Sequence, residues 1–250
     1  MKKIIVLGSS GATGKLVVAQ LLKKNINVIA ILRPSSRLPE AISSHSNLLL
    51  IREEITKLQE SDLARHLQGC DGVISCLGHN LTLKGMFGEP KMLVTDAIEK
   101  VCRSVESIKS GNKFKLILMN TTGNSNRDLA EKPPRSQRWV ISILKLLLPA
   151  HVDNEKAADF LRLQIGQNHE SIEWAVVRPD SLIDDEEVTN YKLLASPIRS
   201  VRFDAGSTGR INVANVMSRL ITEEVLWNQW KGKMPVIYNQ PCKNQIAVAD

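Results

Sequence analysis

The sequence has few aromatic residues and few cysteines, and each shortage limits what the protein can be. Only 4% of its 250 residues are Phe, Trp or Tyr, so aliphatic side chains must fill most of the core. The four cysteines lack C-x-x-C spacing, and neither they nor the five histidines have the spacing of metal ligands. We therefore expect no metal site, and reduced thiols in a cytoplasmic protein.

Long apolar segments and targeting signals are also missing. The apolar run at residues 4–7 is too short for the core of a signal peptide. The longest apolar segment, WVISILKLLL at residues 139–148, falls short of the about 20 residues that cross a bilayer. We expect no membrane partner and interpret residues 139–148 as a buried helix or as the face of a homodimer. A G-x-S-x-G motif is absent too, which argues against a hydrolase.

Acidic residues are scarce in one region, which makes the charge of the chain uneven. The net charge is +7, and residues 100–145 carry ten Lys or Arg but only three acids. A basic face attracts nucleic acid, anionic membranes or phosphorylated ligands. Because no nucleic-acid-binding motif accompanies the charge, we interpret the region as a solvated face of helix and loop, and we expect no nucleic-acid partner.

The sequence does contain a regular alternation of apolar runs with helical patterns. The predicted strands lie at residues 3–7, 28–32, 48–51, 73–76, 115–119, 174–177 and 236–238. The predicted helices lie at residues 14–24, 61–67, 91–108, 154–167 and 213–224. Such alternation indicates parallel strands joined by helices that cover both faces of the sheet. We predict an α/β protein with a single-domain doubly wound parallel sheet (Rossmann fold) over residues 1–250 and a small C-terminal substrate-side lobe, mainly at residues 179–250.

Residues 6–15, VLGSSGATGK, place three glycines between the first predicted strand and helix. In such a turn Gly8 permits the tight bend, Gly11 lets the backbone approach a pyrophosphate, and Gly14 lets the helix pack close to the strand. Free N–H groups from Ala12 to Lys15 would bind the phosphates. The spacing is one residue longer than the usual G-x-G-x-x-G, but its place predicts a dinucleotide-binding loop rather than an incidental turn. The expected contacts are Gly8, Ser10, Gly11, Ala12, Thr13 and Gly14.

The end of the second predicted strand, IAILRPSSR, indicates which dinucleotide binds. Arg33 stands where an NAD site usually carries an acid for the ribose 2′-hydroxyl, and Arg37 follows shortly after. Two guanidiniums and the intervening serine hydroxyls suit a dianionic phosphate. We predict that Arg33, Ser36 and Arg37 bind the 2′-phosphate, so that NADP(H) is preferred over NAD(H). The alternative is a solvated arginine pair in a turn.

With these motifs the chain resembles the atypical short-chain dehydrogenase/reductase group of NAD(P)-binding Rossmann proteins. Within that group it is most similar to the NmrA-like and the biliverdin reductase B–flavin reductase-like members. The resemblance covers about residues 1–238 and depends on GSSGATG at 8–14 and LRPSSRLP at 32–39. Three further strand signatures support it: DGVISCLG at 71–78, LILMNTTG at 116–123 and WAVVRPD at 174–180.

The resemblance implies further contacts along the coenzyme. Glu54 and Ile55 would flank the adenine, although the group more often has Asp-Val or Asp-Leu there. Leu77 and Gly78 would lie along the ribose and pyrophosphate, with residues 79–80 next to them.

At the nicotinamide end, the resemblance implies four more positions. Thr121 and Thr122 would lie beside the nicotinamide, and Pro179 would close over its carboxamide. Lys156, at the start of its predicted helix, lies near the place of a catalytic Lys or Arg in relatives. The candidate catalytic residues are therefore Thr122 and Lys156. The alternative for Thr122 is a strand-end hydroxyl that bonds only to the backbone, and the alternative for Lys156 is a solvated lysine on the face of its helix.

The sequence departs from classical members of the group because it has no Tyr-x-x-x-Lys dyad. Tyr191 and Tyr238 are the only tyrosines, and the residues four positions further on are Ala195 and Cys242. Hydride transfer to a flavin, a quinone or a tetrapyrrole needs orientation more than a strong acid, because solvent can deliver the proton. We therefore expect an NADP(H)-dependent oxidoreductase for a small planar acceptor. The alternatives are a non-catalytic NADP(H)-binding redox sensor or scaffold and, with less support, an epimerase or dehydratase.

Overall fold

The computed structural model of the chain describes residues 2–78, 91–108, 111–129, 131, 149–198 and 206–240. The predicted apolar segment at 139–148 and the coenzyme contacts predicted at 79–80 lie outside these residues. Residues 132–138 and Cys242 also lie outside them.

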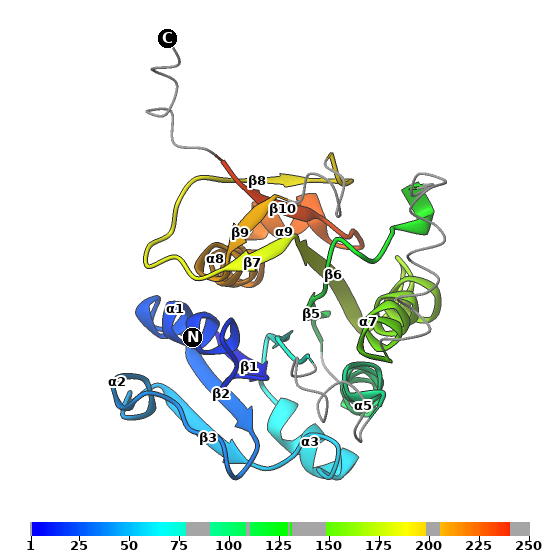
Figure 1. Ribbon diagram of the computed structural model, residues 1–250. Helices are drawn as coiled ribbons and strands as arrows, with labels where there is room; N and C mark the ends of the chain where they lie inside the picture. The colour runs from blue at the N-terminus through cyan, green and yellow to red at the C-terminus, as the bar shows by residue number, and fades with distance from the viewer. Residues whose placement is uncertain are drawn as a thin grey trace.

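Within the described ranges, eight strands form one sheet. They are β1 (Lys3–Leu7), β2 (Asn27–Leu32), β3 (Leu48–Arg52), β4 (Gly72–Ser75), β5 (Phe114–Met119), β6 (Ile172–Pro179), β8 (Tyr191–Leu194) and β10 (Val236–Asn239). Their order is β3-β2-β1-β4-β5-β6-β10-β8, and only β8 runs antiparallel to its neighbour. Figure 1 shows the sheet running from β3 and β2 at the lower left to β10 and β8 at the top. A small parallel pair, β7 (Ser181–Ile183) and β9 (Ser207–Gly209), lies beside it.

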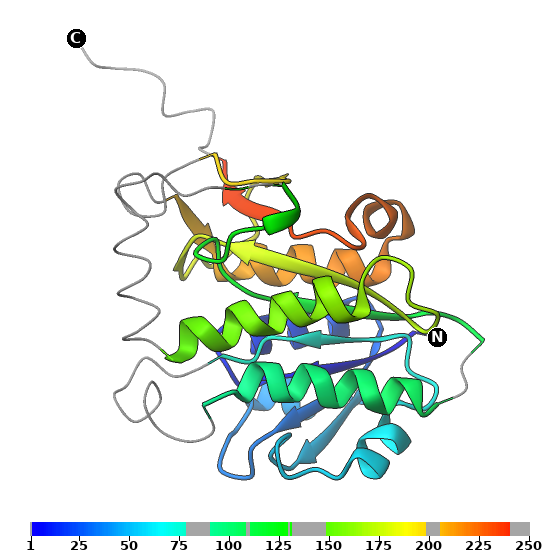
Figure 2. The same cartoon turned by 90° about the vertical axis from the view of Figure 1, so that its right-hand side faces the viewer.

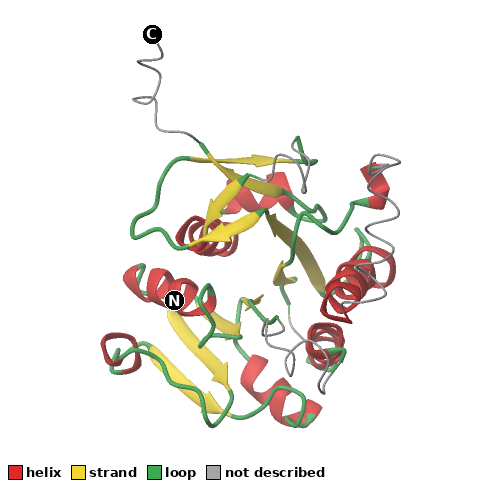
Figure 3. Ribbon diagram, viewed as in Figure 1, coloured by secondary structure: helices red, strands yellow, loops and turns green. Residues whose placement is uncertain are grey.

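Helices cover both faces of this sheet. They are α1 (Gly14–Lys23), α2 (Glu40–Ser43), α3 (Glu60–Leu67), α5 (Leu93–Glu106), α7 (Pro149–Phe160), α8 (Arg210–Thr222) and α9 (Glu224–Trp230), with a short 3₁₀ helix η1 (Arg127–Leu129) and a π-helical turn η2 (Leu161–Ile165). Figure 2 shows α5 and α7 side by side on one face, and Figure 3 shows helices on either side of the strands.

The alternating side chains of β1 show how the sheet divides the core. Ile5 and Leu7 are buried against the face covered by α3, α5 and α7. Ile4 and Val6 are buried against the face covered by α1, α8 and α9. Successive side chains of a strand point to opposite faces, so a run of four aliphatic residues requires helices on both. The predicted doubly wound parallel sheet is confirmed.

The helix predicted over residues 154–167 differs from the observed one. It begins five residues earlier, at Pro149, and continues after Phe160 as the π-helical turn η2. Lys156, which we expected at the helix start, therefore lies in the interior of α7. The short elements α2, α9, β7, β8 and β9 were not predicted, because runs of three to seven residues carry too little periodicity to stand out.

Two features are absent from the described residues. No helix there combines the length and the apolar character needed to cross a bilayer. No group of three or more His, Cys, Asp or Glu side chains there is arranged to hold a metal ion.

Candidate coenzyme-binding site

The turn after β1 brings two strand ends into direct backbone contact. Gly8 has a positive φ of 69°, which a residue with a side chain rarely adopts. A Cβ on Gly8 would also lie 2.7 Å from the carbonyl oxygen of Cys76, directly after β4. The carboxyl ends of β1 and β4 are where the strand order reverses, and ligands of doubly wound sheets bind at that place.

The other two glycines of the turn pack against Gly8 itself. The N–H of Gly11 donates to the carbonyl oxygen of Gly8 at 3.0 Å. A Cβ on Gly14 would lie 2.1 Å from that same oxygen, so only glycine lets α1 begin so close to β1. The tight bend predicted at Gly8 and the close packing predicted at Gly14 thus have a direct counterpart in the turn, and the approach of Gly11 to a pyrophosphate stays a prediction.

Backbone donors remain at the start of α1. The N–H of Lys15 donates to Gly11, so it is not free as the sequence suggested. Within the described part of the chain, the N–H groups of Ala12, Thr13 and Gly14 donate to no acceptor, and the Thr13 side chain does not cap the helix. Orphan donors at a helix N-terminus, together with the helix dipole, favour an anion such as a pyrophosphate.

The arginine loop lies at the same edge of the sheet. β1 and β2 are parallel, with Leu7 opposite Ile31, and the buried Ser9 hydroxyl donates to the carbonyl oxygen of Ile31 at 3.3 Å. Arg33 follows β2 directly and is exposed. Arg37 is also exposed and donates to the carbonyl oxygen of Ser36 at 3.1 Å. The structure therefore brings the predicted pyrophosphate loop and the predicted 2′-phosphate loop to neighbouring strand ends.

The residues expected around the adenine and ribose differ in exposure. Ile55 is buried in the core, whereas Glu54 is half-buried and forms an ion pair with Lys57 at 3.0 Å. Leu77 is half-buried against the core beside Gly8. Gly78 is exposed, and a Cβ added to it would meet no atom of another described residue within 4 Å.

At the end of β5 the structure joins residues that we predicted separately. The N–H of Thr122 donates to the carbonyl oxygen of Pro179 at 3.0 Å, so both predicted nicotinamide contacts are adjacent. The Thr122 hydroxyl donates to the buried carboxylate of Asp180 at 3.4 Å. Thr122 is only 4% exposed, while Thr121 is half-buried and accepts a hydrogen bond from the N–H of Gly123. Asp180 was missed because its partner is 58 residues away in the sequence.

Helix α7 packs its first turns against the same strand end. The Asn120 side-chain amide donates to the carbonyl oxygen of Asn154 at 2.8 Å. A Cβ on Gly123 would lie 3.2 Å from Cε1 of His151, so this imidazole lies against the loop after β5. Lys156 is exposed on α7 and makes no hydrogen bond or ion pair with a described residue. The structure thus brings His151, rather than Lys156, into contact with the loop that carries Thr122.

A buried ion pair between Arg178 of β6 and Glu131 holds the loop after β5. Arg178 is fully buried, and its guanidinium donates to both carboxylate oxygens of Glu131 at 2.8 and 2.9 Å. Burial raises the pKa of Glu131, but the hydrogen bonds from Arg178 and from the Asn126 N–H outweigh it and hold that pKa below its usual value. Arg178 also donates to the carbonyl oxygen of Asn124, which fixes the loop that follows Thr122.

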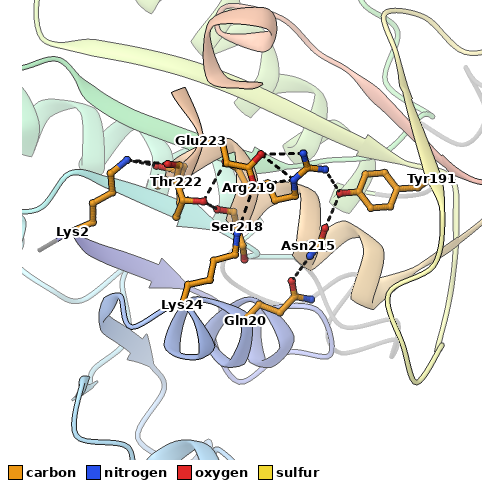
Figure 4. Close-up of polar contacts among 10 residues, drawn as sticks. Lys2, Gln20, Lys24, Tyr191, Asn215, Ser218, Arg219, Thr222 and Glu223 are labelled. Carbon is orange, nitrogen blue, oxygen red and sulfur yellow. Dashed lines mark hydrogen bonds and ion pairs between the residues drawn. The ribbon is translucent and has the colours of Figure 1, made fainter. Parts of the chain in front are cut away.

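Polar side chains also tie α1 to α8 and β8, as Figure 4 shows. The Tyr191 hydroxyl donates to Asn215 at 2.7 Å, and the Asn215 amide donates to Gln20 of α1 at 3.0 Å. Arg219 donates to the Tyr191 oxygen at 3.2 Å and to Glu223 at 2.9 Å. Hydrogen bonds from Arg219 hold the pKa of Glu223 below its usual value. The helix that follows the glycine turn is therefore braced against the C-terminal part of the chain.

Comparisons with known proteins show the family of the chain and its fold. A family model described as NAD(P)H-binding matches residues 8–224. A short-chain dehydrogenase/reductase from Veillonella parvula, solved in complex with NADP, is 16% identical and has a TM-score of 0.65, with 95% of this chain and 94% of that chain covered. The anaerobillin reductase ChuY from Escherichia coli O157:H7 is 16% identical with a TM-score of 0.65, and the match covers 97% and 99% of the two chains. No curated protein sequence matches the chain significantly.

Proposed function

Because the chain belongs to the NAD(P)H-binding family, we propose that it is an NADP(H)-dependent oxidoreductase that transfers hydride to a small planar acceptor such as a flavin, a quinone or a tetrapyrrole. The observation that carries this proposal is the glycine turn. Gly11 and Gly14 both approach the carbonyl oxygen of Gly8, which leaves the N–H groups of residues 12–14 for a pyrophosphate. Two of the similar structures support it, one with bound NADP and one described as a reductase.

The residues at the adenine end would bind and select the coenzyme. Arg33 and Arg37 would contact the 2′-phosphate together with Ser36, and a guanidinium offers two parallel donors to a phosphate. Glu54 and Ile55 would lie at the adenine. The N–H groups at the start of α1, with Ser10 and Thr13, would hold the pyrophosphate.

The residues at the nicotinamide end would orient the reacting ring. A bound nicotinamide supplies the hydride. Leu77 and Gly78 would lie along the ribose and pyrophosphate, and Pro179 would cover the carboxamide. Because the Thr122 hydroxyl donates to Asp180, its oxygen keeps lone pairs that can accept a hydrogen bond from the carboxamide or orient a substrate.

Three further side chains complete this proposal. Thr121 would lie beside Thr122 at the nicotinamide, and Lys156 would bind the ribose or add positive charge. His151 lies against the loop after β5 and would donate to the reduced acceptor the proton that solvent would otherwise deliver. The elements after Pro179 would form the substrate side.

The first test is a titration of the purified protein with NADPH and with NADH, followed by addition of FMN, menadione or biliverdin while nicotinamide absorbance is recorded. We expect tighter binding of NADPH and loss of absorbance with at least one acceptor. Arg33→Asp should weaken NADPH binding roughly 10- to 100-fold and NADH binding far less. The substitution replaces a guanidinium that would donate hydrogen bonds to the 2′-phosphate by a carboxylate, which is negatively charged like the phosphate. Equal weakening of both coenzymes would overturn the preference, and binding of neither would overturn the function.

A second function is favoured by the positions of the two tyrosines. The Tyr191 hydroxyl is held by Asn215 and Arg219, and Tyr238 is 6% exposed in β10, so neither is placed as the acid of a classical dyad. A non-catalytic NADP(H)-binding redox sensor or scaffold would need no such acid. Selective NADPH binding without turnover of any acceptor, together with a protein partner in a pull-down, would favour it over the reductase.

We also propose a cytoplasmic location, from the state of the cysteines. Cys70, Cys76 and Cys102 are free thiols. Burial raises the pKa of Cys70 to about 11 and that of Cys76 to about 12, and it also raises the pKa of Cys102, which favours the neutral thiol in each. Free thiols are typical of a reducing compartment. The homodimer stays a prediction, because its proposed face at residues 139–148 lies outside the described part of the chain.

A further inference from the structure

A third arginine reaches the loop that the sequence assigned to the 2′-phosphate. Arg52 is the last residue of β3 and lies opposite Leu32, the last residue of β2. Its Nη1 donates to the carbonyl oxygen of Ser36 at 3.0 Å, across 16 residues of sequence. The parallel pairing of β2 and β3 therefore places this guanidinium beside the segment from Arg33 to Arg37.

Two guanidiniums converge on one oxygen in this loop. Nη1 of Arg37 donates to the same Ser36 carbonyl at 3.1 Å, as well as to Pro34 at 2.9 Å. A guanidinium has five N–H donors, so most of those on Arg37 and Arg52 have no acceptor in the described part of the protein. Like charges brought together in this way repel each other unless an anion lies between them.

The lack of a carboxylate partner distinguishes the arginines of this loop and Arg52 from the other arginines that the structure describes. Within the described ranges, each of the other arginines forms an ion pair with a carboxylate; these are Arg65, Arg103, Arg127, Arg162, Arg178, Arg210 and Arg219. Arg33, Arg37 and Arg52 form none with a described residue. Arg37 and Arg52 share the Ser36 carbonyl as acceptor, and the Ser36 N–H donates to the carbonyl oxygen of Arg33 at 2.9 Å. Of the two acids that follow Arg52, Glu54 is paired with Lys57, and Glu53 forms no ion pair with a described residue.

We propose that Arg52 is a specificity-determining residue that acts with Arg33 and Arg37 to bind the 2′-phosphate of NADP(H) from the β3 side. This inference rests on the proposed function. A dianionic phosphate is bound more tightly when several guanidiniums contact it at once, whereas a positive charge adds little binding free energy for the uncharged 2′-hydroxyl of NAD(H). Arg52 also holds the Ser36 carbonyl, so it would position the loop as well as supply charge.

Three variants separate the charge of Arg52 from its support of the loop. Arg52→Gln removes the charge but keeps an N–H donor for the Ser36 carbonyl. Arg52→Lys keeps the charge but loses the paired donors of the guanidinium. Arg65→Gln is the matched control, because it removes one exposed arginine charge from a surface ion pair on α3.

The experiment is calorimetric titration of each full-length variant with 2′,5′-ADP, 5′-AMP, NADPH and NADH. We expect Arg52→Gln to weaken 2′,5′-ADP and NADPH about tenfold and to change 5′-AMP and NADH less than about twofold. Arg52→Lys should lie between Arg52→Gln and wild type. Arg65→Gln should bind all four ligands as wild type does.

Other outcomes would overturn the inference in distinguishable ways. Equal weakening of phosphorylated and unphosphorylated ligands by Arg52→Gln would mean that Arg52 only supports the loop. No change in either would mean that it does not touch the coenzyme. Wild-type protein that binds none of the four ligands would overturn the proposed function itself. Because the readout is binding, an absence of turnover with every acceptor would leave the inference standing.

Discussion

The glycines of the site differ in what surrounds the position of their missing Cβ. At Gly14 that position is 2.1 Å from a backbone oxygen, which cannot move without displacing the turn. At Gly78 no atom of another described residue lies within 4 Å of it, and the residue is exposed. The same residue type therefore serves close packing at Gly14, whereas at Gly78 we propose that it serves binding of the coenzyme.

This difference predicts that two alanine substitutions affect different properties, one the stability of the protein and the other its affinity for NADPH. Gly14→Ala should lower the free energy of unfolding by about 1–3 kcal/mol, because the added methyl overlaps the Gly8 carbonyl. Gly78→Ala should leave stability unchanged and weaken NADPH binding. Urea unfolding and NADPH titration of both variants test this. A Gly78→Ala protein that binds NADPH normally would remove Gly78 from the site, and a stable Gly14→Ala protein would contradict the packing argument.

Between elements, one buried carboxylate joins two helices. Asp153 of α7 accepts hydrogen bonds from the N–H groups of Val94 and Thr95 at 2.8 and 2.9 Å, and from the Thr95 hydroxyl at 2.7 Å. These N–H groups belong to the first turn of α5, whose own N-cap residue, Met92, supplies no side-chain acceptor. Asp153 therefore caps α5 from another helix and favours its positive dipole end.

Replacing this carboxylate should loosen α5 more than removing the Thr95 hydroxyl alone. Asp153→Asn should lower the free energy of unfolding by about 1.5–3 kcal/mol, because the new amide NH₂ cannot accept from a backbone N–H. Thr95→Val removes a single hydroxyl and should cost about 1 kcal/mol. Hydrogen exchange should show faster exchange of Val94 and Thr95 in Asp153→Asn. Equal stability of the two variants would argue against the cap.

At the scale of the whole molecule, Arg178 joins segments from distant parts of the chain. Besides Glu131, it donates to the carbonyl oxygens of Asn124, Ala195 and Met234 at 2.9, 3.1 and 2.7 Å. These residues follow β5, follow β8 and precede β10. The charge of Arg178 is buried, so the stability of the folded protein depends on a negatively charged Glu131 beside it.

The pair predicts how stability depends on pH. Because the folded pKa of Glu131 is depressed, its contribution is complete above its usual pKa of about 4.5 and is lost as the pH falls through the lower folded value. Glu131→Gln should cost about 3–5 kcal/mol at pH 7 and show a weaker loss between pH 5 and pH 3 than wild type. The control Glu224→Gln removes an exposed carboxylate and should cost less than about 1 kcal/mol. Urea midpoints across this pH range decide the matter, and identical pH profiles of Glu131→Gln and wild type would rule out the role of Glu131.

Features that depend on neighbouring residues were predictable from the sequence. The alternation of strands and helices follows from local apolar patterns, and it led to the doubly wound sheet that the structure confirms. The roles of Gly8 and Gly14 follow from a turn of a few residues, where strand, turn and helix are adjacent in the chain. The prediction that Arg33 lies at a strand end also needs only the length of that strand.

Contacts between distant residues required the tertiary structure. The proximity of Arg52 to Ser36 depends on β3 pairing with β2, and that of Thr122 to Asp180 on β6 pairing with β5. His151 reaches the loop after β5 because α7 packs across the sheet. Nothing in a local pattern encodes these distances, because the order of strands is decided by how all the apolar faces are buried together. The sequence alone thus determined the type of sheet and the coenzyme turn, and the tertiary structure decided which side chains surround it.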